Sequence, residues 1–237
     1  MCAKEVSMMI QDRRFAFVFR LGSFLFAAFG LLDHVGVFSG DFKPSSFMYY
    51  TIQSNLLAVL LFGLLTARTA TGLREGTHGS SSWHPRLGMV VAVDLLITLI
   101  IFWGLLVPQG MDPGYLWSFD NFAVHTITPL LCLLDYVLFS EPRRLKYRDV
   151  YYVCIFPLCY AVFSWIAGFT GYIYQPGNDL VSDQMESVST RFPYFFLDFD
   201  QLGWWVFAYA AAILVFFLLL GHVIYFVDHK IRKQEAN

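Results

Sequence analysis

Six apolar stretches, each long enough to cross a membrane, constrain this 237-residue chain more than any other feature. A helix needs about 20 apolar residues to cross the hydrocarbon layer of a bilayer. Because lipid offers no partner for an unpaired backbone amide, each stretch must be helical. The stretches cover residues 15–38, 47–67, 87–107, 120–139, 150–174 and 203–227. We therefore predict an all-α integral membrane protein, whose single domain over residues 1–237 is a bundle of six transmembrane helices.

Composition agrees with this class of protein. Only 14% of the residues are charged, against about 25% in ordinary soluble domains. The net charge of -2 gives no indication of a nucleic-acid partner. The four cysteines have neither metal-ligand nor disulfide-framework spacing. We therefore expect no metal site and no cofactor, with membrane lipids as the surroundings of the chain.

The basic residues predict which way the chain crosses the membrane. Of the 16 Lys and Arg residues, only Lys43 and Arg191 fall in the first, third and fifth connections, and Arg20 lies inside the first stretch. All the others fall in the two ends or in the second and fourth connections. Cytoplasmic segments are enriched in Lys and Arg. Both termini are therefore predicted to be cytoplasmic.

Polar residues inside the stretches are the candidates for function, because they are costly in hydrocarbon. Thr51, Ser54 and Asn55 share one helical face at the start of the second stretch, and His125 lies near the start of the fourth. Adhesion between helices would account for each of these features taken alone. However, both stretches begin on the non-cytoplasmic side, and Thr51 and His125 lie at a similar depth, roughly 6–8 Å in. A hydroxyl within reach of an imidazole is the minimal nucleophile-and-base pair.

The position of this pair near two helix N-termini favours the same chemistry. The positive end of a helix dipole stabilises an oxyanion and disfavours imidazolium. Pro129 is expected to kink the fourth helix and to free a backbone carbonyl near His125. Further candidates for contacting substrate or an oxyanion, or for orienting His125, are Tyr50, Ser54, Asn55, Asp33, His34 and Asn121.

A second group of polar residues lies deeper, on the cytoplasmic half. Asp94 and Asp135 share a depth, and we expect them to be structural, paired with each other through a shared proton or with His222. An alternative function uses the same three residues as the proton path of a non-enzymatic lipid or small-molecule carrier, or of a proton-coupled transporter. The chain has no convincing internal repeat, which weighs against the inverted-repeat transporter folds. The aromatic segment at residues 192–205 is expected to fold back against the bilayer.

Several short motifs resemble a known family of six-span proteins. They are Tyr50-Thr51 with Gln53-Ser54-Asn55, and His125-Thr126 followed by Pro129. These resemble the androgen-induced and androgen-dependent membrane protein family and its bacterial relatives. Residues 193–198 and the end of the sixth stretch resemble the bacterial branch in particular, which implies a bacterial cytoplasmic membrane. Residues around Thr51 differ from those of the animal members.

The resemblance implies an activity. Eukaryotic members of that family are threonine hydrolases that cleave fatty acid esters of hydroxy fatty acids, with a Thr nucleophile and an essential His. By resemblance, Thr51 and His125 take these roles here. The predicted function is hydrolysis of a lipid ester or another amphiphilic substrate within the membrane.

Overall fold

The computed structural model describes residues 9–174 and 190–231, and all the elements in these two ranges are helices. Six helical segments are long and apolar enough to cross a membrane: Arg13–His34, Tyr50–Arg74, Pro85–Gln109, Phe119–Phe139, Tyr147–Phe169 and Phe199–Lys230. They coincide with the six predicted stretches, displaced by a few residues at their ends. The chain is thus a multi-pass helical bundle. The basic residues Lys4, Arg232 and Lys233 lie outside the described residues.

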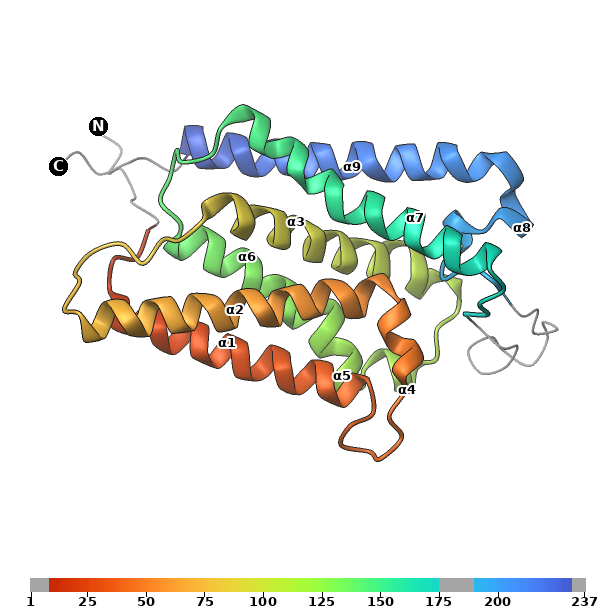
Figure 1. The fold of residues 1–237 in the computed structure, drawn as a ribbon, viewed down its shortest axis with the longest axis horizontal. Coiled ribbons are helices and arrows are strands. Elements are labelled where there is room, and N and C mark those ends of the chain that lie inside the picture. The colour runs from red at the N-terminus through yellow and green to blue at the C-terminus, as the bar shows by residue number, and fades with distance from the viewer. Residues whose placement is uncertain (1–8, 175–189, 232–237) are drawn as a thin grey trace.

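The bundle has three pairs of helices (Figure 1). α1 (Arg13–His34) packs along α2 (Tyr50–Arg74), and α3 (Pro85–Ile101) packs along α6 (Thr128–Phe139). The third pair is α9 (Val206–Phe226) and η5 (Tyr147–Cys154), which continues into α7 (Ile155–Phe169). The first residues of α1 and the last residues of α9 lie at the same end of the bundle. Shorter segments connect the helices, with bounds η1 Pro44–Met48, α4 Pro113–Leu116, α5 Phe119–Phe122, η5 Tyr147–Cys154, η6 Phe195–Leu197, α8 Phe199–Leu202 and η7 Gly203–Trp205.

Three of the long helices contain a π-helical turn, with one extra residue in the turn. These turns are η2 (Phe102–Leu106), which continues α3 into η3 (Val107–Gln109); η4 (Ala123–Ile127), which precedes α6; and η8 (Val227–Ile231), which follows α9. Such turns are rare in proteins as a whole, but those that occur are often found at functional sites. Where a kink was expected near Pro129, the structure has the π-helical turn η4, directly before α6 begins at Thr128.

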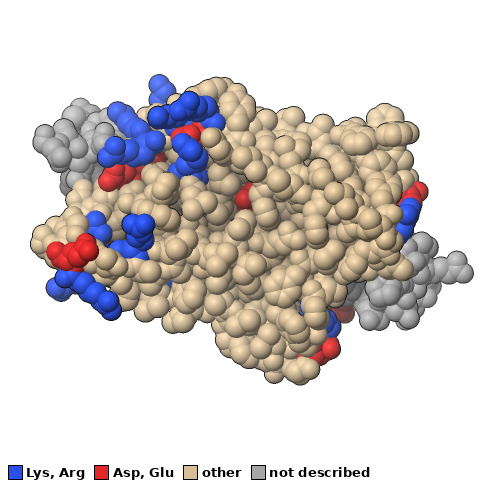
Figure 2. Space-filling view, viewed as in Figure 1, with Lys and Arg blue, Asp and Glu red and all other residues tan. Residues whose placement is uncertain are grey.

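The surface of the bundle is divided as a bilayer requires. Figure 2 shows charged side chains gathered at the two ends, with most of the Lys and Arg at the end where α1 begins. The long flank between the ends is almost free of charge in this view. Large apolar side chains in the long helices, such as Leu60 of α2 and Val215 and Leu219 of α9, are exposed. An apolar flank of this kind is stable in hydrocarbon and not in water.

A buried ion pair joins three helices near the basic end. Arg20 of α1 is 1% exposed, and its Nε lies 2.7 Å from Oδ1 of Asp135 on α6. The same guanidinium donates to the hydroxyl of Thr69 on α2 and to the carbonyl of Ser81. The expectation that Asp135 pairs with Asp94 or His222 was therefore wrong, because Arg20 reaches the carboxylate and supplies an opposite charge.

His222 and Asp94 also have partners other than those expected. The His222 ring lies 2.7 Å from the Leu218 carbonyl through Nδ1 and 3.3 Å from the Tyr147 hydroxyl through Nε2. The Asp94 carboxylate accepts a hydrogen bond from the Tyr50 hydroxyl at 3.2 Å. The three residues of the proposed proton path thus bind three different partners.

The ion pair generates a stability prediction. Arg20→Ala leaves the Asp135 carboxylate buried without a cation, which should lower the free energy of unfolding by about 3–5 kcal/mol. Replacing both residues by apolar ones of similar size, as in Arg20→Met with Asp135→Leu, should lose much less. Thermal unfolding in detergent measures both effects. If the single variant is as stable as the double variant, the pair does not stabilise the bundle.

Candidate active site

Thr51 and His125 meet across the bundle. Thr51 is the second residue of α2, and His125 lies in the π-helical turn η4. The Thr51 Oγ1 atom lies 3.3 Å from the His125 Nε2 atom, and both residues are buried. The contact expected from their similar depth is therefore confirmed.

The second nitrogen of the imidazole determines its tautomer. His125 Nδ1 lies 3.1 Å from the backbone carbonyl of Asn121, one turn earlier. A carbonyl oxygen accepts hydrogen bonds and cannot donate them, so Nδ1 carries the proton of the neutral ring. Nε2 then presents its lone pair to Thr51, as a general base must. Asn121 thus orients His125 through its backbone.

Packing holds the imidazole ring in this orientation. The Phe102 ring stacks on the His125 ring, with centroids 3.8 Å apart and planes 19° apart. A hydrogen bond of 3.0 Å from Trp103 Nε1 to the Thr126 hydroxyl runs between the same two π-helical turns, η2 and η4. The two π-helical turns therefore contact each other through Phe102 and His125 and through Trp103 and Thr126.

Neither Asp33 nor His34 forms the hydrogen bond that orients His125. His34 Nδ1 lies 3.0 Å from the Asp120 carboxylate, and its ring approaches the His125 ring edge-on at 6.0 Å between centroids. Asp33 accepts the Gly36 amide through its backbone carbonyl, in the turn that ends α1. His34 thus neighbours His125, but the hydrogen bond that orients the catalytic candidate comes from Asn121.

Asn55 fastens the two halves of the site together. Its Nδ2 donates to the Thr51 carbonyl at 2.8 Å and to the Val124 carbonyl, in the turn that holds His125, at 3.0 Å. Pro129 has no N–H to donate back to this turn, which leaves a carbonyl in need of a donor. Asn55 supplies that donor, and it is fully buried. Its role is to hold Thr51 and His125 in register.

Ser54 and Tyr50 make contacts between helices. The Ser54 hydroxyl donates to the Thr51 carbonyl and lies 3.2 Å from the Thr98 hydroxyl on α3. The Tyr50 hydroxyl donates to the carboxylate of Asp94, which also lies on α3. Asp94 is thus linked to the residue beside Thr51, contrary to the expectation that it lies apart from the site.

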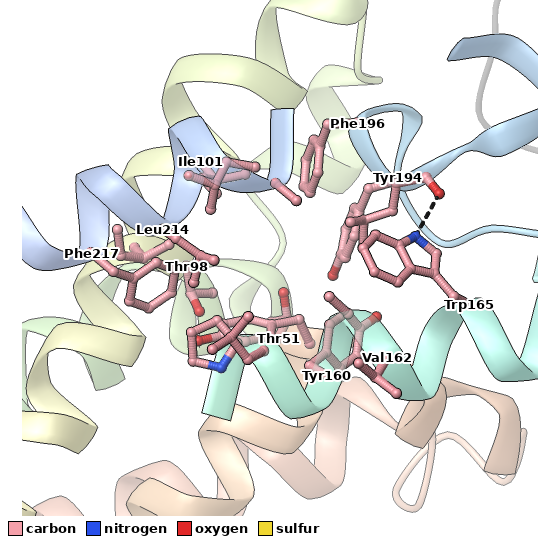
Figure 3. Close-up of a pocket in the computed structure, with 18 of the residues that line it drawn as sticks. Thr51, Thr98, Ile101, Tyr160, Val162, Trp165, Tyr194, Phe196, Leu214 and Phe217 are labelled. Carbon is pink, nitrogen blue, oxygen red and sulfur yellow. Dashed lines mark hydrogen bonds between the residues drawn. The ribbon is translucent and has the colours of Figure 1, made fainter. Parts of the chain in front are cut away.

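An apolar cavity of about 110 Å³ lies beside Thr51. Figure 3 shows its wall, to which α2, α3, α7, α9 and the segment at residues 194–197 all contribute. Thr51 lines the cavity, whereas His125 is not among its described lining residues and touches it through Thr51 and Phe102. Apart from hydroxyl groups and the Trp165 indole, the lining side chains are apolar, and no Lys, Arg, Asp or Glu is among those described.

Residues of α7 and α9 form one side of the cavity. The two helices are joined at one end by the rings of Trp165 and Phe207, whose centroids are 5.4 Å apart. At the other end Gly221 of α9 packs against η5, where Val150 and Val153 lie so close that a side chain on Gly221 would touch them. Between these contacts, the lining residues Leu158 and Val162 of α7 and Ala210 and Leu214 of α9 flank the cavity, and Leu158 and Val162 are exposed on the flank of the bundle.

Tyr194 is a member of the site that the sequence did not identify. It lies in the aromatic segment before η6 and lines the cavity together with Thr51. Its phenol oxygen lies near the hydroxyls of Thr51 and Tyr160 and the backbone amides of Tyr50 and Thr51. The segment was expected to fold back against the bilayer; in the structure its residues Phe192, Phe196 and Leu197 are buried against the bundle. Its many aromatic residues signalled burial, but not which ring would face Thr51.

Known proteins give no further guide to the site. Comparisons of the chain with protein family models, with curated proteins and with solved structures found no match. Within residues 9–174 and 190–231, no group of three or more His, Cys, Asp or Glu residues is arranged to hold a metal ion. The chemistry available to the site is therefore argued from its side chains and helix ends.

Asn55 offers a test of this geometry. Asn55→Leu keeps the volume but leaves the buried Val124 carbonyl without its side-chain donor, so the free energy of unfolding should fall by about 1–3 kcal/mol. Thermal unfolding in detergent measures this loss. The ring of His125 should also lose its fixed position, which NMR of the imidazole nitrogens would detect as loss of a single tautomer. An unchanged imidazole spectrum would contradict the role given to Asn55.

Proposed function

We propose that the protein is an intramembrane hydrolase of lipid esters, with Thr51 as nucleophile and His125 as general base. One observation carries the proposal: Thr51 Oγ1 lies 3.3 Å from His125 Nε2, while Nδ1 is held by the Asn121 carbonyl. In this arrangement the free lone pair of a neutral imidazole points at a buried hydroxyl. A structural hydrogen bond would need neither the defined tautomer nor an adjacent cavity.

The reaction follows from these positions. His125 takes the Thr51 proton as the hydroxyl oxygen attacks the ester carbonyl, and the carbonyl electrons move onto oxygen. The amides of Tyr50 and Thr51 belong to the first turn of α2, where helix amides have no intrahelical acceptor. Such amides stabilise the oxyanion. Collapse transfers the proton from His125 to the leaving alcohol, and water then releases the acyl group from Thr51 by the same route.

The cavity is suited to a substrate whose bound part is uncharged and apolar. Its described lining has no charged side chain that could pair with a carboxylate or a phosphate. A fatty acyl chain bound in this cavity, against α7 and α9, would bring its ester to Thr51. Lipid esters are also the substrates implied by the resemblance to the androgen-induced and androgen-dependent family, in which a threonine hydrolase activity is known.

The orientation in the membrane belongs to the same proposal. The basic end of the bundle would face the cytoplasm, in a bacterial cytoplasmic membrane, with Thr51 nearer the opposite face. Thr77 and Ser39 are exposed at connections on opposite sides. In a chain without native cysteines, an impermeant maleimide should label Ser39→Cys in intact cells and Thr77→Cys only after lysis. The reverse pattern would overturn the orientation.

The chemistry is tested with a purified chain, a fluorophosphonate probe and 4-methylumbelliferyl oleate in detergent. Thr51→Ala should abolish labelling and turnover, because it removes the nucleophile, while Thr51→Ser should retain activity. His125→Ala should also abolish turnover, since an unassisted alcohol is a weak nucleophile at neutral pH. The rate should fall on the acid side, because protonated imidazole cannot accept the Thr51 proton.

A matched control is available on the same helix. Thr71 is exposed, and its hydroxyl donates to the Ala67 carbonyl one turn earlier. Thr71→Ala should therefore keep wild-type turnover and labelling. Ester hydrolysis by Thr51→Ala at the wild-type rate would refute the enzyme and favour a lipid carrier in which the cavity only binds.

A further inference from the structure

Tyr194 reaches the nucleophile from a remote part of the chain. Its segment lies between α7 and α9 in the sequence, yet its side chain lines the cavity at the start of α2 (Figure 3). The ring is fixed on two sides, because it stacks on Phe196 at 5.1 Å between centroids and lies 6.3 Å from the Tyr160 ring. A ring that is held this firmly presents its hydroxyl at a defined point.

The surroundings of that hydroxyl have the properties of an oxyanion site. Tyr194 lines the cavity beside Thr51, and its phenol oxygen lies near the Thr51 and Tyr160 hydroxyls and the amides of Tyr50 and Thr51. The N-cap residue Tyr49 makes no side-chain cap to these amides, so they are open to an acceptor from elsewhere. A hydroxyl that is near the nucleophile and near two amide donors borders the place where the carbonyl oxygen of a bound ester would lie.

We propose that Tyr194 is a third catalytic residue, whose hydroxyl donates a hydrogen bond to the oxyanion formed when Thr51 attacks an ester. When an ester is bound, the amides of Tyr50 and Thr51 donate to the ester oxygen, and the phenol hydroxyl points its proton toward the same oxygen. No proton is transferred in this contact. The proton of Thr51 moves to His125 and then to the leaving alcohol.

The state of the phenol suits a donor. Burial raises the pKa of the Tyr194 phenol, while the Thr51 hydroxyl and the two amides act in the opposite direction. The hydroxyl therefore stays protonated at neutral pH and keeps its proton available. Donors fixed in advance around a developing charge are among the strongest contributors to catalysis in a dry site. This inference rests on the proposed hydrolase activity and adds one residue to it.

The test is Tyr194→Phe in the purified full-length chain, assayed with 4-methylumbelliferyl oleate. The ring contacts remain, so the variant should unfold at nearly the wild-type temperature. Loss of one oxyanion donor should lower kcat about 10²-fold or more, with KM nearly unchanged. The rate of fluorophosphonate labelling should fall in parallel, because the phosphonyl oxygen occupies the same site.

The control is the neighbouring phenol of Tyr49, whose hydroxyl donates to the Tyr174 carbonyl at 2.9 Å. Tyr49→Phe should keep the wild-type kcat. A second measurement does not depend on removing the hydroxyl. A fluorinated tyrosine at position 194 should keep activity near neutral pH and lose it at a lower alkaline pH than the wild type, because a phenolate cannot donate. A purely structural ring would leave this alkaline limit unchanged.

The outcomes separate the two proposals. Wild-type or higher kcat in Tyr194→Phe, with Thr51→Ala inactive, would overturn the role of Tyr194 and leave the hydrolase standing. A higher kcat would show that the phenol obstructs the oxyanion site. Absence of Thr51-dependent turnover in the wild type would overturn both.

Discussion

The backbone of this protein must satisfy its own hydrogen bonds, because hydrocarbon offers none, and the rest of the structure depends on that constraint. Regular helices meet it almost everywhere. Where the regular pattern is broken, side chains complete it: Asn55 donates to the Val124 carbonyl in the turn before Pro129. The same break opens the π-helical turn that aims His125 at Thr51. The candidate active site is therefore a consequence of how one irregular turn is satisfied inside the bundle.

The two buried aspartates show two ways of keeping a carboxylate in a bundle. Asp135 has a full countercharge in Arg20, which also binds Thr69 and the Ser81 carbonyl. That arrangement ties α1, α2 and α6 to the connection after α2. The described partner of the Asp94 Oδ1 atom is the phenol hydroxyl of Tyr50. Because Tyr50 is also the first residue of α2, this hydrogen bond holds the helix start from which Thr51 projects.

Span number, span type and the contact between Thr51 and His125 could all be predicted from the sequence, because they depend on hydropathy and on the fixed rise of a helix. The ends were harder to predict. The first span was expected to reach residue 38, but α1 ends at His34, where Gly36 adopts a positive φ and the Asp41 carbonyl approaches too closely for a side chain. α2 continues to Arg74, beyond its predicted end at residue 67, since a helix leaving the membrane needs no apolar residues.

Lateral neighbours could not be predicted in the same way. Periodicity gives the face on which a residue lies, but not which helix that face meets, and so Asp135 was matched with the wrong partner. Arg20 was the missing charge, 115 positions away in the chain. Tyr194 was missed for a related reason. It belongs to a connection without a regular repeat, and its position follows from the burial of Phe192, Phe196 and Leu197 around it.

The arrangement separates chemistry from chain binding. Thr51, His125 and Asn55 come from α2 and η4, on the side of the bundle formed by α1, α2 and α6. Another part of the cavity wall is formed by α7 and α9, whose lining residues include the aliphatic or small Leu158, Val162, Ala210 and Leu214. The hydrogen bonds that align Thr51 with His125 therefore do not involve α7 or α9. A lipid chain bound against these two helices would leave the nucleophile and base in register, and Tyr194, which lines the same cavity from the connection between them, would link chain binding to the chemistry.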